Sequence, residues 1–181
     1  MIMDSIDKNQ KEDNYKDLYS VEAGERIREM AESAKTCFFC TEAGLGDSSG
    51  VRPMSVLKVY DDGTLWFLSA KDSYKNHEIS MRSKVKLFFQ GSAHADFLFL
   101  TGTASITDDK EKIKELWTPV AKAWFTEGID DPRVSVIKVV PDDGFYWDNK
   151  HGNLIAGAKM MFGAVTGQTL DDSIQGKLKT H

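Results

Sequence analysis

Two short segments of this sequence pair a basic side chain with features that suit a phosphate group. In the first segment, Arg52 follows a Gly/Ser-rich loop and opens an expected strand with Pro53, Met54 and Ser55. A guanidinium is planar, and its N–H fork can hold two phosphate oxygens at once. Taken alone, an arginine at this position is more often an ordinary solvated surface residue.

The second segment places a hydroxyl and an ammonium where an expected strand ends and a helix begins. It runs from Phe67 and Leu68 through Ser69 to Tyr74 and Lys75. The first amides of a helix lack intrahelical partners and favour anions, which places Ser69 and Lys75 beside a natural phosphate site. One hairpin of chain separates this segment from the first, so both basic residues can return to the same end of a sheet. The alternative is an ordinary capped helix with a solvated lysine.

A third region, residues 117–148, is rich in aromatic side chains. It ends in a strand-like stretch that carries Trp147 followed by Asp148. A tryptophan at such a strand is commonly a core or interface aromatic. Trp124 and Phe125 are expected to be lid or core residues rather than ligands.

The cysteines and histidines lack the patterns that metal or redox chemistry needs. Cys37 and Cys40 have C-x-x-C spacing, but they lie in a β-branched and aromatic run in which residues three apart point to opposite faces. A redox pair opens a helix and a zinc site needs four ligands, so two buried or half-buried thiols are expected, with redox chemistry or a metal as alternatives. No metal site is predicted, because no pair has ligand spacing among His77, His94, His151 and His181.

The elements that must position these residues are mostly strands joined by short turns. Expected strands cover residues 36–41, 51–60, 64–70, 85–90, 97–107, 134–140 and 145–148, with turns at 61–63 and 141–144. A first helix is expected through Ala34 with Ser20 as its cap, and a second over residues 71–83. A third is expected from Asp108 or Asp109 through Trp117, with a further helical piece to Phe125.

The spacing of these elements favours an antiparallel barrel of about six strands with peripheral helices. Helices do not alternate regularly with strands, so a doubly wound parallel sheet is disfavoured. The chain is expected to have a flexible arm at residues 1–14, one domain at 15–166 and a loose tail at 167–181. A small apolar run at 154–165 could form a final helix on the barrel or on a partner chain.

The bulk composition excludes several classes of partner. The 181 residues are 41% hydrophobic and 28% charged, as in an ordinary globular domain. A formal charge of −5 leaves no electrostatic footprint for nucleic acid. The polar N-terminus lacks the apolar core of a signal peptide, and no stretch is long and apolar enough for a membrane span. A cytoplasmic location and no membrane partner are therefore expected.

The three segments together resemble the pyridoxamine 5′-phosphate oxidase superfamily, and more closely its general stress protein branch, over about residues 20–150. The resemblance implies a split β-barrel that binds flavin mononucleotide (FMN) at the interface of a homodimer. It implies that Arg52 and Lys75 hold the phosphate, with Tyr74 where the classical oxidases carry a second basic residue. The backbone after Arg52, together with Leu68 and Ser69, would line the ring and ribityl chain, and Trp147 would face the flavin from the second subunit.

The resemblance leaves two functions open. One is a flavin-dependent oxidoreductase of a small substrate, and the other is a non-catalytic protein that binds or buffers flavin. A true pyridoxamine phosphate oxidase is disfavoured, because the basic Arg-x-His element that follows the strand tryptophan in those enzymes is missing here. Haem or a deazaflavin is a further alternative, since split barrels bind both, and haem would need an axial ligand such as His94 or His151.

Overall fold

The computed structural model describes residues 14–42, 50–92, 96–149 and 173–181, which form one large sheet with helices around it. The helical elements are α1 (Ser20–Ala34), α2 (Tyr74–Met81), α3 (Lys110–Leu116) and the 3₁₀ turns η1 (Pro119–Ala123) and η2 (Gly128–Asp130). The strands are β1 (Leu18–Tyr19), β2 (Thr36–Thr41), β3 (Val51–Ser55), β4 (Lys58–Val59), β5 (Leu65–Ala70), β6 (Lys84–Gln90), β7 (Phe97–Thr107), β8 (Val134–Asn149) and β9 (Ser173–Lys179).

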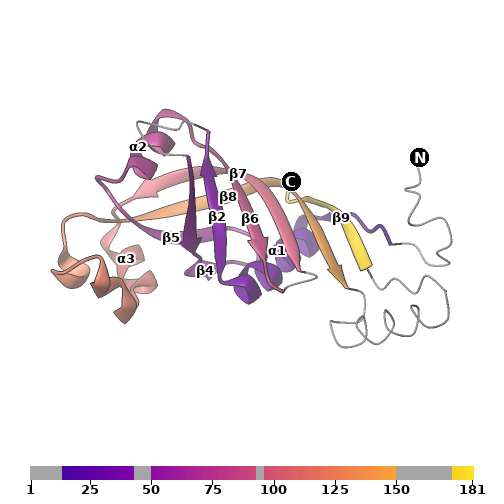
Figure 1. Cartoon of the computed structure of the whole chain (residues 1–181), viewed down its shortest axis with the longest axis horizontal. Coiled ribbons are helices and arrows are strands. Elements are labelled where there is room, and N and C mark those ends of the chain that lie inside the picture. Colours follow the sequence, from indigo (N-terminus) through magenta and orange to yellow (C-terminus); the bar gives the residue numbers. More distant parts are fainter. Residues whose placement is uncertain (1–13, 43–49, 93–95, 150–172) are drawn as a thin grey trace.

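The sheet confirms the mainly β, split-barrel fold expected from the sequence. Its order is β1-β9-β8-β7-β6-β2-β3, while β5 pairs with the first part of β8 and with β4. All of the long strands pair antiparallel, and the short β1 alone is parallel, to β9. Six strands make the barrel itself (β2, β3, β5, β6, β7 and β8), and β1, β4 and β9 extend it. Figure 1 shows this curved sheet, with α2 and α3 placed at its periphery.

The barrel is split where β3 and β5 approach each other without pairing. β3 pairs only with β2, and β5 only with β4 and β8, so no ladder of hydrogen bonds joins β3 to β5 among the described strands. We call this place the seam. Because α2 follows β5 after a three-residue turn, its first residues lie at the seam.

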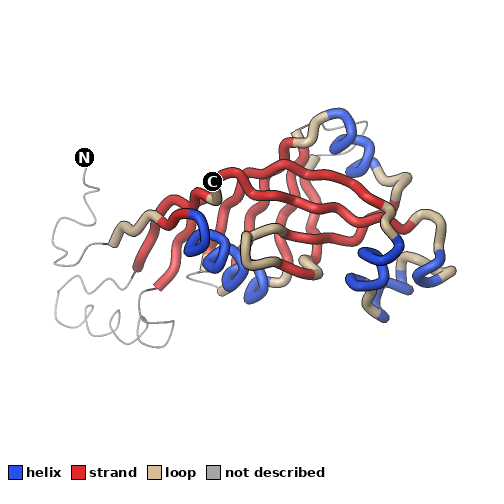
Figure 2. Tube along the Cα trace, turned by 180° about the vertical axis from the view of Figure 1, so that it is seen from behind, coloured by secondary structure: helices blue, strands red, loops and turns tan. Residues whose placement is uncertain are grey.

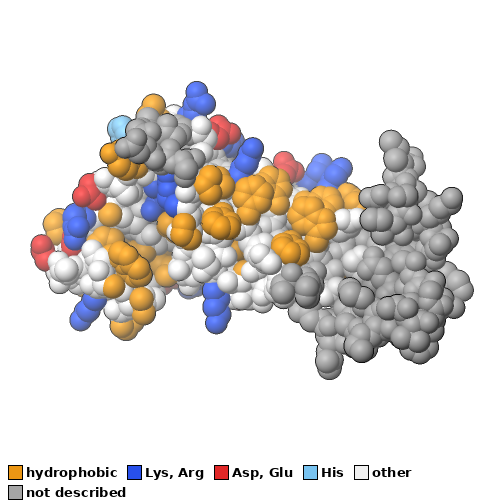
Figure 3. Space-filling view, in the orientation of Figure 1, with side chains coloured by type: hydrophobic (Ala, Val, Ile, Leu, Met, Phe, Trp, Pro, Cys, Tyr) orange, Lys and Arg blue, Asp and Glu red, His pale blue; other side chains and the backbone are white. Residues whose placement is uncertain are grey.

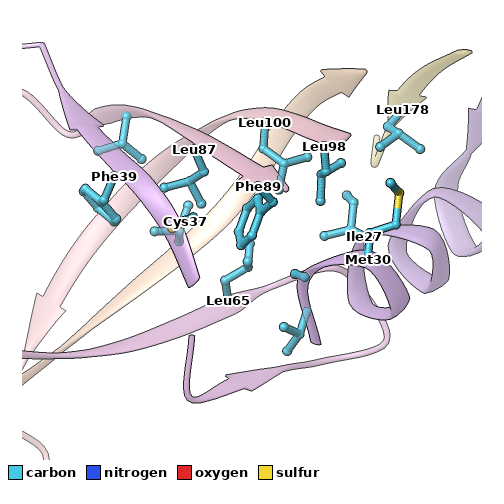
Figure 4. Close-up of a cluster of buried hydrophobic side chains, with 14 of the residues drawn as sticks. Ile27, Met30, Cys37, Phe39, Leu65, Leu87, Phe89, Leu98, Leu100 and Leu178 are labelled. Atoms are coloured by element: carbon cyan, nitrogen blue, oxygen red, sulfur yellow. The ribbon is translucent and has the colours of Figure 1, made fainter. Parts of the chain in front are cut away.

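The main core lies between α1 and the inner face of the sheet. Figure 4 shows Ile27 and Met30 of α1 pointing toward Leu98 and Leu178 of the strands. This is the three-and-four spaced stripe expected from the sequence, and burying it fixes the helix on the sheet. A second apolar cluster packs α3 and η1 on β5 and the start of β8, through Trp66, Ile113, Leu116, Ala121, Phe125, Val134 and Val136.

Several predicted boundaries were wrong. The expected loose tail at 167–181 contains β9, which pairs along the second part of β8 and contacts β1 (Figure 2). Its sequence alternates polar residues with Ile174, Gly176 and Leu178, which is the two-residue period of a strand. The expected turn at 141–144 is a bulge instead, because β8 continues through it with Asp142 as one extra residue opposite β7.

Other differences are smaller and have local causes. The expected strand 51–60 breaks into β3 and β4, because the chain leaves β2 and crosses to β5, where the Leu57 amide donates to the Trp66 carbonyl. Ser20 is the first helical residue rather than the cap of α1, and no side chain caps that end. Asp109 does cap α3, accepting from two backbone amides as expected. The expected arm at 1–14 and the apolar run at 154–165 lie almost entirely outside the described residues.

Candidate functional site

Arg52 is the second residue of β3, the strand that borders the seam, and its side chain lies on the inner face of the sheet. It pairs with Phe39 of β2 and so points to the same face as that fully buried ring. Its own side chain is only 20% exposed. A guanidinium held on the inner face of an edge strand needs an anionic partner, because burying a charge without one is costly.

The partner that the fold supplies is Glu78 of α2, whose side chain is fully buried. One carboxylate oxygen, Oε2, accepts from Arg52 Nη2 at 2.8 Å and from the Thr41 hydroxyl at 2.6 Å. The contact therefore joins α2 to the ends of β2 and β3. Sequence analysis missed both Glu78 and Thr41, because an acid within a short helix and a threonine at a strand end carry no distinctive pattern.

Lys75 is half-buried at the start of the same helix, one turn before Glu78. Burial, and then the nearby Arg52 guanidinium, lower the pKa of Lys75 from its ordinary value of 10.5 to about 8, although Glu78 opposes the shift. Within the described residues, the Lys75 ammonium has no hydrogen-bond or ion-pair partner. Among the described residues, the seam thus holds two cations and one carboxylate, and the carboxylate bonds to Arg52 but not to Lys75.

The start of α2 is held in place by a buried polar network. Ser73 caps the helix by accepting from the Asn76 amide. Ser69 donates to Asn76 Oδ1 at 2.7 Å, and the Asn76 amide group donates to Ser135 at 2.9 Å. Because Ser69, Asn76 and Ser135 are all buried, this network fixes the position of the first turn of α2, where Lys75 lies.

The outer face of the sheet carries a row of four phenylalanine rings and one proline, all exposed or half-exposed. Pro53, Phe38, Phe88, Phe99 and Phe145 are paired in register across five neighbouring strands, from β3 to β8. Figure 3 shows a band of hydrophobic side chains across this side of the molecule, beside a group of Lys and Arg side chains. We call these five residues the aromatic row.

A groove of about 930 Å³ runs along this face. Trp147 of β8 lines it, lies 4.6 Å from the Phe145 ring between centroids, and is 42% exposed. Phe38 is 59% exposed and Phe88 45% exposed, values that are high for phenylalanine in a strand. Large exposed apolar surfaces are typical of interaction sites. The sequence did carry a signal for this one, because the alternation along β6 places Phe88 on the same face as the polar residues of that strand.

The structure divides the predicted site residues between the seam, the groove and the core. Arg52 and Lys75 meet at the seam, and Pro53 and Trp147 line the groove. Tyr74 is exposed at the start of α2, and Ser55 is exposed at the end of β3.

The other predicted site residues are directed elsewhere. Phe67 is fully buried and packs edge-on against Phe39, so only its backbone is available to a ligand. Met54 packs against the main core, and Leu68 packs against the second apolar cluster. Ser69 is committed to the network at the start of α2.

The cysteines and aromatics outside the site behave mostly as expected. Cys37 is buried and Cys40 half-buried on β2, as free thiols, and burial raises the pKa of Cys37 to about 12. Such a thiol is a poor nucleophile. Phe125 belongs to the second cluster, whereas Trp124 is exposed.

The described residues provide neither a cluster of metal ligands nor a membrane-spanning helix. In the described parts of the chain, no group of three or more His, Cys, Asp and Glu side chains is placed to hold a metal ion. His94 and His151, named above as haem ligands, lie outside the described residues. No helix that the structure describes is long and apolar enough to cross a membrane.

Comparison with known proteins identifies the family. Residues 22–171 match the family described as Pyridoxamine 5'-phosphate oxidase like. The chain belongs to this family. Protein bli-3 of Neurospora crassa is 31% identical over 83 residues, which span 41% of this chain and 40% of that protein.

Solved structures of the same fold include general stress proteins. A structure named for general stress protein 26 of Jannaschia sp. CCS1 has a TM-score of 0.70 and 23% identity, covering 87% of this chain and 97% of that chain. The general stress FMN/FAD binding protein of Xanthomonas citri has a TM-score of 0.59 and 24% identity, covering 68% of this chain and 86% of that one. At these identities, the likeness shows the fold.

Proposed function

We propose that this member of the pyridoxamine 5'-phosphate oxidase-like family is a general stress flavoprotein that binds FMN with its phosphate at the seam. The observation that carries the proposal is the state of Lys75, a half-buried ammonium next to Arg52 with no anionic partner of its own among the described residues. Two cations and one carboxylate leave a net positive charge in a partly desolvated place. A phosphomonoester dianion is the ligand that this charge would favour.

The geometry of the surrounding elements fits a phosphate and a flat ring. Lys75 lies in the first turn of α2, where backbone amides without intrahelical partners add to the attraction for an anion. Pro53, the residue after Arg52, points to the other face of β3 and lines the apolar groove, so a ligand whose phosphate lies at the seam can pass the edge of β3 and extend its ring along that groove. When bound, FMN would supply redox chemistry at its ring, and the chain would bind, orient and shield it.

A second copy of the chain is the partner that we propose for the aromatic row. A row of rings across five strands is a large, flat and apolar surface, and a two-fold axis through it would bury the row against itself. Pro53 and Trp147 line the groove near opposite ends of the row, so a two-fold axis that reverses the row would place Trp147 against the flavin held by the other protomer. FMN would then lie at the subunit interface of a homodimer.

The activity that we propose is flavin-dependent oxidoreduction of a small substrate that is not pyridoxamine phosphate. The basic Arg-x-His element is absent from the sequence after Trp147, so no clamp for a second phosphate group is provided there. Anaerobic mixing with NADH or NADPH separates this activity from simple flavin storage. Reduction well above the rate of free FMN supports an oxidoreductase, and reduction at the rate of free FMN supports a flavin-holding protein. A cytoplasmic location stays a prediction.

The test of the phosphate site is FMN affinity after removal of each cation. Arg52→Ala and Lys75→Ala are each expected to weaken FMN binding by about 1.5–3 kcal/mol, because each removes a charge-assisted hydrogen bond. Arg82→Ala, at an exposed arginine at the other end of α2, is the matched control and should leave affinity unchanged. Unchanged FMN affinity in both site variants would overturn the assignment.

A further inference from the structure

Glu78 is a buried acid in the middle of a site that we assign to an anion, and this needs an explanation. Its side chain is fully buried, and its carboxylate lies close enough to raise the pKa of Lys75. By charge alone, Glu78 should weaken the binding of a phosphate. An acid is retained in such a place only if it does something that offsets the repulsion.

The contacts of Glu78 indicate what that is. A single oxygen, Oε2, receives both the Thr41 hydroxyl and Arg52 Nη2, at 2.6 and 2.8 Å. Thr41 is itself held at the end of β2, where its hydroxyl also lies 3.2 Å from the Gly50 carbonyl oxygen. The carboxylate is therefore fixed from two directions and offers Arg52 one defined attachment point.

Arg52 is a residue that needs such an attachment. It lies on β3, which pairs with β2 on one side and has no ladder on its seam side among the described strands. An arginine side chain that is not already oriented loses rotamer entropy when a ligand immobilises it. A guanidinium has five N–H donors, so an arginine that is oriented by one carboxylate can still donate to a second anion.

We propose that Glu78 is a positioning residue, which holds the Arg52 guanidinium in the orientation that a phosphate requires. The inference rests on the proposed phosphate site. Pre-orientation means that the entropy of fixing Arg52 is lost during folding rather than during binding, so ligand affinity rises. The carboxylate repels the phosphate at the same time, and the orienting effect exceeds the repulsion.

Positioning and simple charge balance predict opposite results for Glu78→Gln. This variant keeps the shape and one acceptor oxygen but removes the charge. If Glu78 only opposed the phosphate, FMN would bind more tightly to the variant. If Glu78 positions Arg52, FMN binds about tenfold more weakly, because a charge-assisted contact becomes a neutral one and Arg52 is less restrained.

The experiment measures FMN and riboflavin affinity by fluorescence titration for the wild type, Glu78→Gln, Arg52→Ala and the double variant. The ratio of the two affinities isolates the contribution of the phosphate. We expect Glu78→Gln to lower this ratio about tenfold when Arg52 is present, and to raise it in the Arg52→Ala background, where only the repulsion of the phosphate is lost. Glu32→Gln, the same change at an exposed glutamate of α1, is the control and should leave the ratio unchanged.

Thr41→Val guards against a folding failure of Glu78→Gln, because it removes one hydrogen bond to Glu78 without changing any charge. We expect it to lower the FMN to riboflavin ratio by about two- to threefold. A further readout needs no flavin: the Arg52 side-chain ¹⁵N signals should show faster guanidinium rotation in Glu78→Gln than in the wild type.

The outcomes separate this inference from the function on which it rests. A wild type that does not prefer FMN to riboflavin removes the proposed phosphate site itself. A wild-type preference that is unchanged or increased in Glu78→Gln overturns only the positioning role. A decrease of the ratio in Glu78→Gln that persists without Arg52 also overturns it, because Glu78 would then act through something else.

Discussion

At the scale of single residues, the half-buried charge of Lys75 lowers the stability of the fold, because burial removes water from the ammonium group. The unfolded chain holds Lys75 with an ordinary pKa of 10.5, whereas the fold lowers this pKa to about 8. Between these values the unfolded state binds more protons, so stability rises with pH from about 8 to 10.5. Below pH 8 the destabilisation by Lys75 is fully present.

Lys75→Met should therefore stabilise the flavin-free protein while it weakens FMN binding. Methionine keeps the unbranched stem but removes the partly desolvated charge, and we expect a gain of about 1–3 kcal/mol in the free energy of unfolding at pH 7. Chemical denaturation of the flavin-free variant measures this. Lys122→Met, at an exposed lysine of η1, is the control and should change stability by less than about 0.5 kcal/mol. Loss of stability in Lys75→Met would indicate a structural lysine.

The pH dependence of FMN binding provides a second test of the same residue. A phosphate next to Lys75 raises its pKa, so binding above pH 8 requires uptake of a proton. Titration of Lys75 should change the FMN dissociation constant little between pH 7 and 8. Above pH 8, loss of the Lys75 proton should raise this constant by up to about tenfold per pH unit. Riboflavin, titrated in parallel, controls for ionisation of the flavin ring. A flat profile for FMN above pH 8 would contradict direct contact with Lys75.

Sequence reasoning could find the cations of this site but not its acid. Arg52 and Lys75 stand at recognisable places, a strand start after a loop and a helix start after a strand. Glu78 has no such mark, because its role depends on α2 packing across the ends of β2 and β3. The direction of the Phe67 side chain was hidden for a related reason: alternation along β5 turns its ring into the core, and a segment match does not record the direction of a side chain.

At the scale of elements, the sequence indicated the strands of the barrel, whereas the strands that extend it needed the structure. Local alternation and turn residues mark β2, β5, β6 and β7, and their bounds agree closely with expectation. β9 pairs with a strand far away in the sequence, and its seven residues include only two large apolar ones. The bulge at Asp142 looks like a turn locally and is kept in the sheet by the pairing of β8 with β7 and β9.

Gly176 provides a test of the extension made by β1 and β9. A Cβ at this position would lie 1.9 Å from the Lys16 carbonyl oxygen, so the segment before β1 crosses directly over the glycine. Gly176→Ala should lower the free energy of unfolding by about 1–3 kcal/mol, because backbone must move to relieve the overlap. Thermal unfolding measures the change, and Lys179→Ala, at an exposed position of the same strand, should be close to neutral. Equal stability of the two variants would contradict the crossing.

At the scale of the whole molecule, the aromatic row predicts a dimer. Phe88→Glu places a charge in the centre of the row, where a second copy would bury it, and we expect the variant to be monomeric in light scattering. Trp124→Glu changes another exposed aromatic, on the η1 side outside the row, and should stay dimeric like the wild type. A wild type that is monomeric at the same concentration, or a Phe88→Glu dimer, would contradict the proposed interface.

A crystal structure of the protein grown with FMN tests most directly whether the flavin phosphate binds at the seam. We predict that phosphate oxygens lie about 3 Å from the Arg52 guanidinium and from Lys75 Nζ, and that the ring extends along the groove toward Trp147 of a second protomer. A flavin bound elsewhere, or a seam in which both cations face solvent while FMN is bound, would contradict it.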